Sequence, residues 1–135
     1  MATALYDSGR EGILDSSINW TTGTIKAILI DTGTYSVNLA TDKFQSDIPS
    51  GARIAVSPAL TSKTATGGVA NAAGVTFSAV VGASVEAVVL FQDTGVAGTS
   101  RLIAYIDSGT GLPVTPNSGD ISIAWNTGAN KIFKL

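Results

Sequence analysis

Short apolar runs bounded by Gly, Asn, Asp and Ser recur along the chain and predict a series of β-strands. The clearest alternation lies in residues 74–81, where Val75, Phe77, Ala79 and Val81 would share one face. Residues 84–91 are almost continuously apolar, which is typical of a strand buried on both faces. We expect the principal strands at 24–30, 74–81, 84–91, 101–106, 120–125 and 131–135, and weaker ones at 52–57, 59–64 and around Val69.

Two segments have a helical pattern instead. Residues 3–14 bring four apolar side chains near one side, those of Leu5, Tyr6, Ile13 and Leu14. Two glycines in this segment weaken a helix by about 1 kcal/mol each. In residues 41–49, Thr41 is placed to cap the first turn and Pro49 to end the helix. The sequence therefore predicts one or two short helices.

The order of these elements predicts the fold class. Strands follow one another without the strand–helix alternation of a parallel sheet, which indicates an antiparallel β-sandwich, jelly-roll or immunoglobulin-like, or a barrel. We expect a single mainly β domain over residues 1–135 with a short helical N-terminal segment. The turn "NTGAN" predicts a hairpin between the last two strands. The low-complexity stretch 61–74 favours a long hairpin or a mobile loop.

Composition excludes several classes of function. The chain has 135 residues, a net charge of −2, no cysteine and no histidine. Without a net positive charge it does not fit the simplest nucleic-acid binders. Thiolate catalysis, disulfides and His-based triads or metal sites are also excluded. No apolar run approaches the roughly 18 residues of a membrane helix, and no secretory signal is recognisable. We expect no cofactor and no metal.

The chain is more apolar than one small core requires. Charged residues make up 13% of the sequence and the mean hydropathy is +0.32. One explanation is that part of the surface is buried against other copies or other proteins. The alternative is that abundant Ala, Gly, Ser and Thr dilute the charge without creating any patch.

The sequence "ILIDTGT" around Asp31 matches the catalytic loop of aspartic proteases. Related triplets begin at Asp93, Asp107 and Asp7. A protease would need two such loops face to face, so that two carboxylates share one proton. Asp-x-Gly at a strand end is also a common turn, because Asp bonds to the backbone two residues on and Gly tolerates positive φ. Four copies favour turns over a catalytic site, and we expect no enzyme activity.

A sugar-binding module is another alternative. Trp20, Tyr35, Tyr105 and Trp125 are the aromatic residues that could form a platform for a sugar ring. Aromatic residues on strands more often belong to the core or to cross-strand pairs.

Taken end to end, the chain resembles a group of small structural proteins found in the virions of tailed bacteriophages. The resemblance rests on residues 4–49, from "ALYDSGREGIL" to "KFQSDIP", and on "GVTFSAV" (74–80). It continues through "VEAVVLFQDTG" (85–95), "SRLIAYID" (100–107) and the ending "SGDISIAWNTGANKIFKL" (118–135). The resemblance implies a location in the phage particle, after synthesis in the bacterial host cytoplasm, and it implies no catalytic residues.

Within a virion, the composition fits a capsid decoration (cement) protein best. Such a protein binds at capsomer junctions and stabilises the head. The alternative is a neck, tail or fibre-associated structural protein. In both cases the expected partners are further copies of the chain, as a trimer or another homo-oligomer, and the major capsid protein or another virion protein. We expect neither nucleic acid nor a membrane as partner.

The two ends of the chain are the expected places of assembly contacts. The candidate residues are apolar and close to one end or the other: Leu5, Tyr6, Ile132, Phe133 and Leu135. The alternative for these residues is ordinary core packing of a helix and a last strand.

Overall fold

A five-stranded antiparallel sheet forms the centre of the fold, with strand order β1-β7-β6-β2-β3. The computed structural model describes residues 3–107, 112–125 and 131–135. The strands of the central sheet are β1 (Thr3–Leu5), β2 (Ile25–Ile30), β3 (Arg53–Val56), β6 (Ala87–Gln92) and β7 (Arg101–Ile106). The mainly β, antiparallel fold class predicted from the sequence is confirmed.

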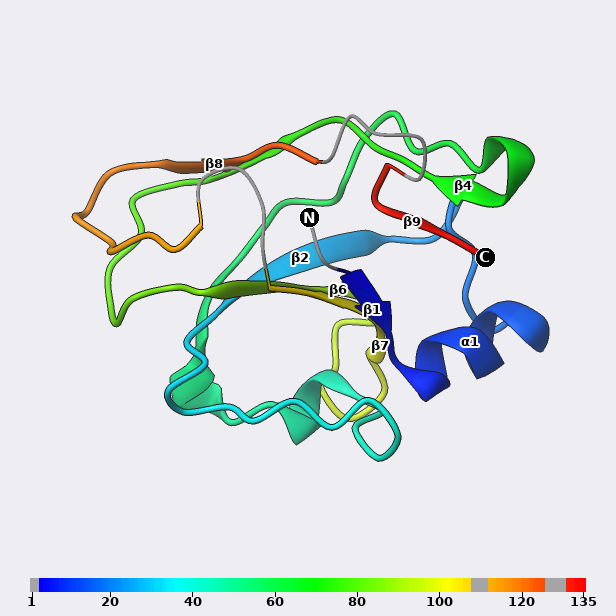
Figure 1. The fold of residues 1–135 in the computed structure, drawn as a ribbon, viewed down its shortest axis with the longest axis horizontal. Helices are drawn as coiled ribbons and strands as arrows, with labels where there is room; N and C mark the ends of the chain where they lie inside the picture. The colour runs from blue at the N-terminus through cyan, green and yellow to red at the C-terminus, as the bar shows by residue number, and fades with distance from the viewer. Residues whose placement is uncertain (1–2, 108–111, 126–130) are drawn as a thin grey trace.

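Two small strand pairs lie over one face of the central sheet (Figure 1). β5 (Val75–Phe77) pairs with β8 (Ile121–Ile123), and β4 (Val69–Ala70) pairs with β9 (Phe133–Lys134). Apolar side chains of β5, β8 and β9 pack with Ile25, Ala27 and Leu29 of β2 in one buried cluster. This cluster fills the space between the two β layers, as in a sandwich.

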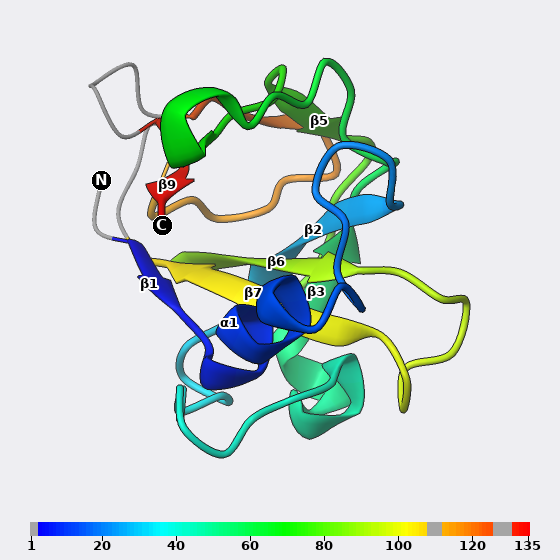
Figure 2. The same ribbon diagram turned by 90° about the vertical axis from the view of Figure 1, so that its right-hand side faces the viewer.

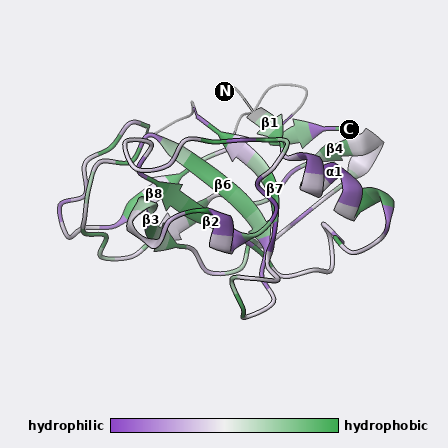
Figure 3. Cartoon of the chain, turned by 90° about the horizontal axis from the view of Figure 1, so that it is seen from below, coloured by the Kyte–Doolittle hydropathy of each residue, from purple (hydrophilic) through white to green (hydrophobic). Residues whose placement is uncertain are grey.

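The other face of the central sheet is covered by the segment between β2 and β3, which lies below the sheet in Figures 1 and 2. This segment contains two 3₁₀ turns, η1 (Gln45–Asp47) and η2 (Ser50–Ala52). Ile28 and Ile30 of β2 point into a second buried cluster with Tyr35 and Ile48 of the segment. β2 and β6 are therefore buried on both faces, and Figure 3 shows the hydrophobic residues concentrated there.

The N-terminal segment covers the outer edge of β7. β1 pairs with Ala104–Ile106, and the Tyr6 backbone N–H donates to the Ile103 carbonyl at 3.0 Å. Helix α1 (Asp7–Leu14) then packs against β7. Gly9 allows this packing, since a Cβ there would lie 2.6 Å from the Ile103 carbonyl oxygen. The predicted helix over 3–14 thus begins at Asp7, because the residues before it complete the sheet.

The second predicted helix, over 41–49, is wrong: only Gln45–Asp47 form a 3₁₀ turn. Side-chain oxygens take the backbone donors that a helix would use. Asp47 Oδ2 accepts from the N–H groups of Lys43 (2.7 Å) and Phe44 (3.0 Å). Thr41 caps no helix, because the 3₁₀ turn begins after Phe44, and the Thr41 N–H donates to Asn38 Oδ1.

The strand predicted over 74–81 ends at Phe77. Ala79 has a φ of +51°, which interrupts the strand, and Val80 is buried whereas Val81 is 63% exposed. Residues 59–64 form no strand. Thr64 instead makes a two-way backbone bridge to Asn71, which supports the hairpin alternative for 61–74.

The predicted hairpin between the last two strands is also wrong. β8 pairs with β5, matching Val75 to Ile123 and Phe77 to Ile121. β9 pairs with β4, where the Phe133 ring meets Trp20 edge-on at 5.4 Å. Residues 126–130 of the turn lie outside the described residues. In these pairings Phe77, Ile121 and Phe133 join the buried cluster of the sandwich. An isolated two-stranded hairpin is only marginally stable in water, so pairing within the sandwich is favoured. Among the described residues, no helix has the length and apolar character needed to cross a membrane.

Candidate interaction surface

The two best-matched Asp-Thr-Gly loops lie at opposite ends of the central sheet. Asp31 follows the end of β2 and Asp93 follows the end of β6. These strands are antiparallel, with Ile25 opposite Gln92 and Ile30 opposite Ala87. At about 3.4 Å per residue along a six-residue strand, the two loops are roughly 20 Å apart. Asp31 and Asp93 therefore cannot form a carboxylate pair that shares a proton.

Each of these carboxylates closes its own turn instead. Asp31 accepts from the Gly33 N–H at 2.9 Å and from the Thr34 hydroxyl at 3.0 Å. Asp93 accepts from the Gly95 N–H at 2.9 Å, and Gly95 has a φ of +88°. The turn interpretation is confirmed at both loops.

The two remaining Asp-x-Gly triplets, at Asp7 and Asp107, lie in other surroundings. Asp7 is the first residue of α1 and pairs with Arg10 at 3.1 Å. Asp107 follows the end of β7, and the two residues that complete its triplet lie outside the described residues. Within the described parts of the chain, no three acidic side chains are close enough together to hold a metal ion.

Among the described residues, Asp93 belongs to the most buried of the ion pairs. Its Oδ2 lies 2.7 Å from Lys26 Nζ, with both side chains less than a third exposed. The Lys26 ammonium, and then the Gly95 N–H, hold the pKa of Asp93 below its usual range. This pair ties the loop after β6 to β2.

Three of the four aromatic residues of the suggested platform are buried, and the fourth, Tyr105, is partly buried. Trp20, Trp125 and Tyr35 are buried in the two clusters. The indole N–H groups donate to backbone carbonyls, Trp20 to Asn71 at 3.3 Å and Trp125 to Ala73 at 2.9 Å. These tryptophans are core residues whose polar ends are satisfied, so the sugar-binding alternative loses its proposed surface.

A hydrogen-bonded chain connects the buried Tyr6 and Tyr35 to the partly buried Asp42. The Tyr35 hydroxyl donates to Asp42 Oδ2 at 2.6 Å, so the Tyr6 hydroxyl, 2.9 Å away, donates to Tyr35. Burial is the main cause that raises the pKa of both tyrosines, so both hydroxyls stay protonated at neutral pH. These hydrogen bonds between Tyr6, Tyr35 and Asp42 fasten the segment after β2 to the N-terminal segment.

Four of the five predicted assembly residues lie in the core. Leu5, Tyr6, Ile132 and Phe133 are each no more than 8% exposed. In this conformation they offer almost no surface to a partner. Their burial agrees with the alternative of ordinary core packing. Leu135 differs, because 62% of it is exposed.

Leu135 lies in a surface groove between α1 and β9. Two adjoining cavities, of about 370 and 230 Å³, share Ile13 and Leu135 as lining residues. The first is lined by Leu5, Arg10, Ile13, Leu14, Lys134 and Leu135. The second reaches Ile18, Trp20 and Phe133. We call these two cavities together the α1–β9 groove.

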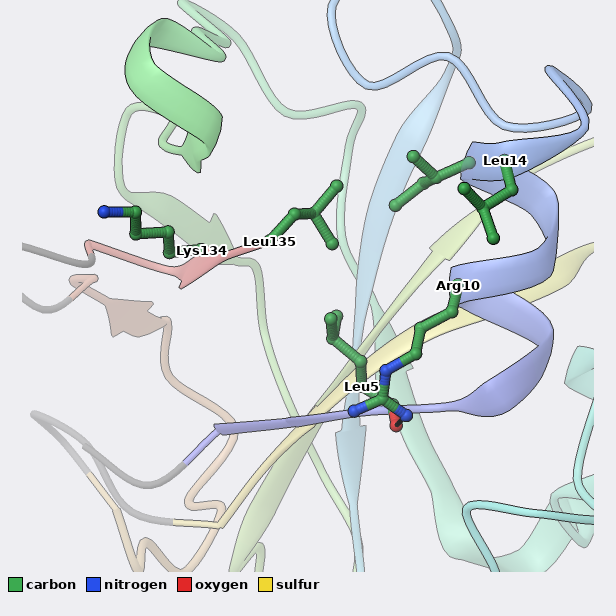
Figure 4. A pocket seen from close by; sticks show the side chains of 6 residues that line it. Leu5, Arg10, Leu14, Lys134 and Leu135 are labelled. Atoms are coloured by element: carbon green, nitrogen blue, oxygen red, sulfur yellow. Dashed lines mark hydrogen bonds between the residues drawn. The ribbon is translucent and has the colours of Figure 1, made fainter.

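The walls of the α1–β9 groove are predominantly apolar. Figure 4 shows the side chains of Leu5, Leu14 and Leu135 pointing toward one another across the first cavity. Leu14 is 86% exposed, the most exposed large apolar side chain among the described residues. Exposed apolar surface of this kind commonly marks a site of protein association.

Sequence reasoning placed Leu135 among the contacts but missed Leu14. The pattern of residues 3–14 put Leu14 near one side of a longer helix, together with Leu5, Tyr6 and Ile13. Because α1 begins at Asp7 and buries Ser8, Gly9 and Gly12, its small residues face the sheet. Leu14 is thereby turned outward, and an apolar residue beside two inward-facing glycines was the available signal.

No protein-family model matches this chain, and no curated protein matches it. The α1–β9 groove is therefore interpreted from its own geometry.

Proposed function

We propose that this chain is a non-enzymatic structural protein of a tailed-bacteriophage particle, and that it decorates the capsid at capsomer junctions. The observation that carries the proposal is the α1–β9 groove, whose Leu14 and Leu135 present apolar surface to a partner. The resemblance of the sequence to phage virion proteins points to the particle as the place where that partner is found.

The physical mechanism is mass action on the assembled lattice. A protein whose binding site exists only where capsomers meet stabilises the assembled state and not the separate subunits. At a free concentration about 100 times the dissociation constant, one such site contributes about 2.7 kcal/mol. Several weak sites on one oligomer add to this through effective concentration.

An add-back experiment tests this role. Particles made without this chain are heated with and without the purified protein, and DNA release is followed by dye fluorescence. We expect the protein to raise the temperature of release in a saturable way. If particles lacking the chain released DNA at the same temperature with or without it, the decoration role would be excluded, and a neck, tail or fibre role would take its place.

A further inference from the structure

Helix α1 buries no large apolar side chain. Its buried residues are Ser8, Gly9 and Gly12, all of them small. Of its two apolar residues of any size, Ile13 is only partly buried against the core and Leu14 is 86% exposed. Helices in folded proteins are stabilised mainly by packing an apolar face. Because α1 has no such face, its docking on the sheet gains little from the hydrophobic effect.

The local sequence of α1 does not compensate for this. Two of its eight residues are glycine, the weakest helix former after proline. Among the described residues, no side chain caps its first turn, and its last turn has no basic residue to interact with the helix dipole. A helix of this length and composition would not persist away from the sheet.

Polar contacts with β7 hold α1 in place. The Ser8 hydroxyl donates to the Leu102 carbonyl at 3.2 Å, and Arg101 Nη1 donates to the Ser8 carbonyl at 3.3 Å. On either side of α1 the chain is anchored in the core, because Tyr6 and Ile18 are each no more than 5% exposed. Thus α1 is a weakly docked unit between two firm anchors.

α1 also forms the wall between the two cavities of the α1–β9 groove. Ile13 lines both cavities. Ile18, which lines the inner cavity, lies directly against α1, since a Cβ at Gly12 would overlap with the Ile18 side chain. Moving α1 away from β7 would therefore uncover Ile18 and join the two cavities.

We infer that α1 is a gate, a helix that undocks from β7 as a local unit while the central sheet stays folded. The closed state is the conformation described above, and the open state joins the two cavities of the groove. A partner that uses the inner cavity binds the open fraction, so its apparent affinity is reduced in proportion to that fraction. The gate is a property of this chain alone and does not depend on which partner the groove binds.

Backbone amide hydrogen exchange tests whether α1 opens locally. The amides of Arg10 and Asp15, which donate within α1, should exchange on the order of a hundred-fold faster than those of β6. Their exchange should be insensitive to low concentrations of urea, because a local opening exposes little surface, whereas exchange in β6 should accelerate. Amides in α1 that are as slow and as sensitive to urea as those of β6 would overturn the inference.

Two substitutions separate local opening from global unfolding. Ile28→Val weakens the core at a fully buried position on β2, and it should raise exchange in β6 roughly three- to ten-fold while leaving α1 unchanged. Gly9→Ala should raise exchange in α1 on the order of ten-fold, because its Cβ would lie 2.6 Å from the Ile103 carbonyl oxygen. Gly98→Ala, where a Cβ meets nothing within 4 Å, is the matched control for Gly9→Ala.

Each substitution can contradict the gate. If Ile28→Val accelerated exchange in α1 as much as in β6, α1 would open only when the whole protein unfolds. If Gly9→Ala left exchange in α1 unchanged, the opening would not be an undocking from β7.

Thiol labelling tests whether the opening uncovers the inner cavity. The chain has no cysteine, so Ile18→Cys and Val89→Cys each introduce a single thiol, the first behind α1 and the second in the fully buried part of β6. With N-ethylmaleimide, the thiol at position 18 should react on the order of a hundred-fold faster than the thiol at position 89. Equal rates would show that α1 does not expose the inner cavity and would overturn the gate.

Discussion

Aspartate side chains close turns in this protein by accepting bonds from nearby backbone N–H groups. Asp31, Asp47 and Asp93 each do so within four residues of sequence. The bonds of Asp31 and Asp93 are predictable, because the Asp-x-Gly pattern itself specifies the turn. Those of Asp47 were not, since no such pattern follows it and the segment was expected to be a helix. The Tyr6–Tyr35–Asp42 chain was not predictable, since Tyr6 and Tyr35 are 29 residues apart and meet only in the folded state.

Tyr35→Phe should destabilise the protein by about 1–3 kcal/mol, because it leaves the Tyr6 hydroxyl buried without its partner. Chemical denaturation followed by tryptophan fluorescence measures this change. Tyr105→Phe is the matched control, since that ring is only partly buried and its hydroxyl makes no hydrogen bond to any described residue; its effect should be under about 0.5 kcal/mol. Equal effects of the two substitutions would contradict a structural role for the chain of hydroxyls.

The Lys26–Asp93 pair predicts a specific pH dependence. The pKa of Asp93 is lowered in the folded state, so the pair stabilises the fold above the unfolded pKa of about 4. That contribution is lost as the pH falls through the folded pKa. Asp93→Asn should cost about 1 kcal/mol or less at pH 7, and progressively less below pH 4.

Urea denaturation between pH 2.5 and 7 measures the stability difference between Asp93→Asn and the wild type. Glu11→Gln serves as the control, because that side chain is exposed and makes no ion pair within the described residues. A difference for Asp93→Asn that does not vary with pH would show that the ion pair contributes nothing.

At the scale of elements, hydrophobic pattern predicted the long buried strands well. β2 and β7 agree with their predicted ranges to within a residue, since six consecutive strand-forming residues outweigh local alternatives. Which strand pairs with which was less predictable from the sequence. β8 and β9 follow one another in the chain, yet each joins a different partner, because pairing depends on which apolar faces meet across the sandwich.

The packing of α1 on β7 depends on a glycine. Gly9→Ala should destabilise the protein by about 1–3 kcal/mol, although alanine favours a helix, because its Cβ would lie 2.6 Å from a backbone oxygen. Gly98→Ala is the control, since nothing lies within 4 Å of a Cβ there. Thermal unfolding compares the two. A Gly9→Ala protein as stable as the wild type would mean that α1 is not held this closely.

At the scale of the whole molecule, the sequence predicted a mainly β domain with apolar surface to bury, and it named Leu135. It could not show that Leu5, Tyr6, Ile132 and Phe133 are enclosed, because exposure depends on neighbours distant in sequence. The exposure of Leu14 and the groove that it lines became apparent only when α1 and β9 were seen together. These features favour a protein that acts by binding other proteins, and the proposed place of that binding is the capsid.

The number of copies of this chain per purified virion, measured by quantitative mass spectrometry against the major capsid protein, tests this proposal most directly. Capsid decoration predicts a ratio near one copy per capsid subunit, or one oligomer per small group of subunits. A ratio of a few per cent would contradict decoration and indicate the neck, tail or fibres. Absence from the particle would contradict every virion role.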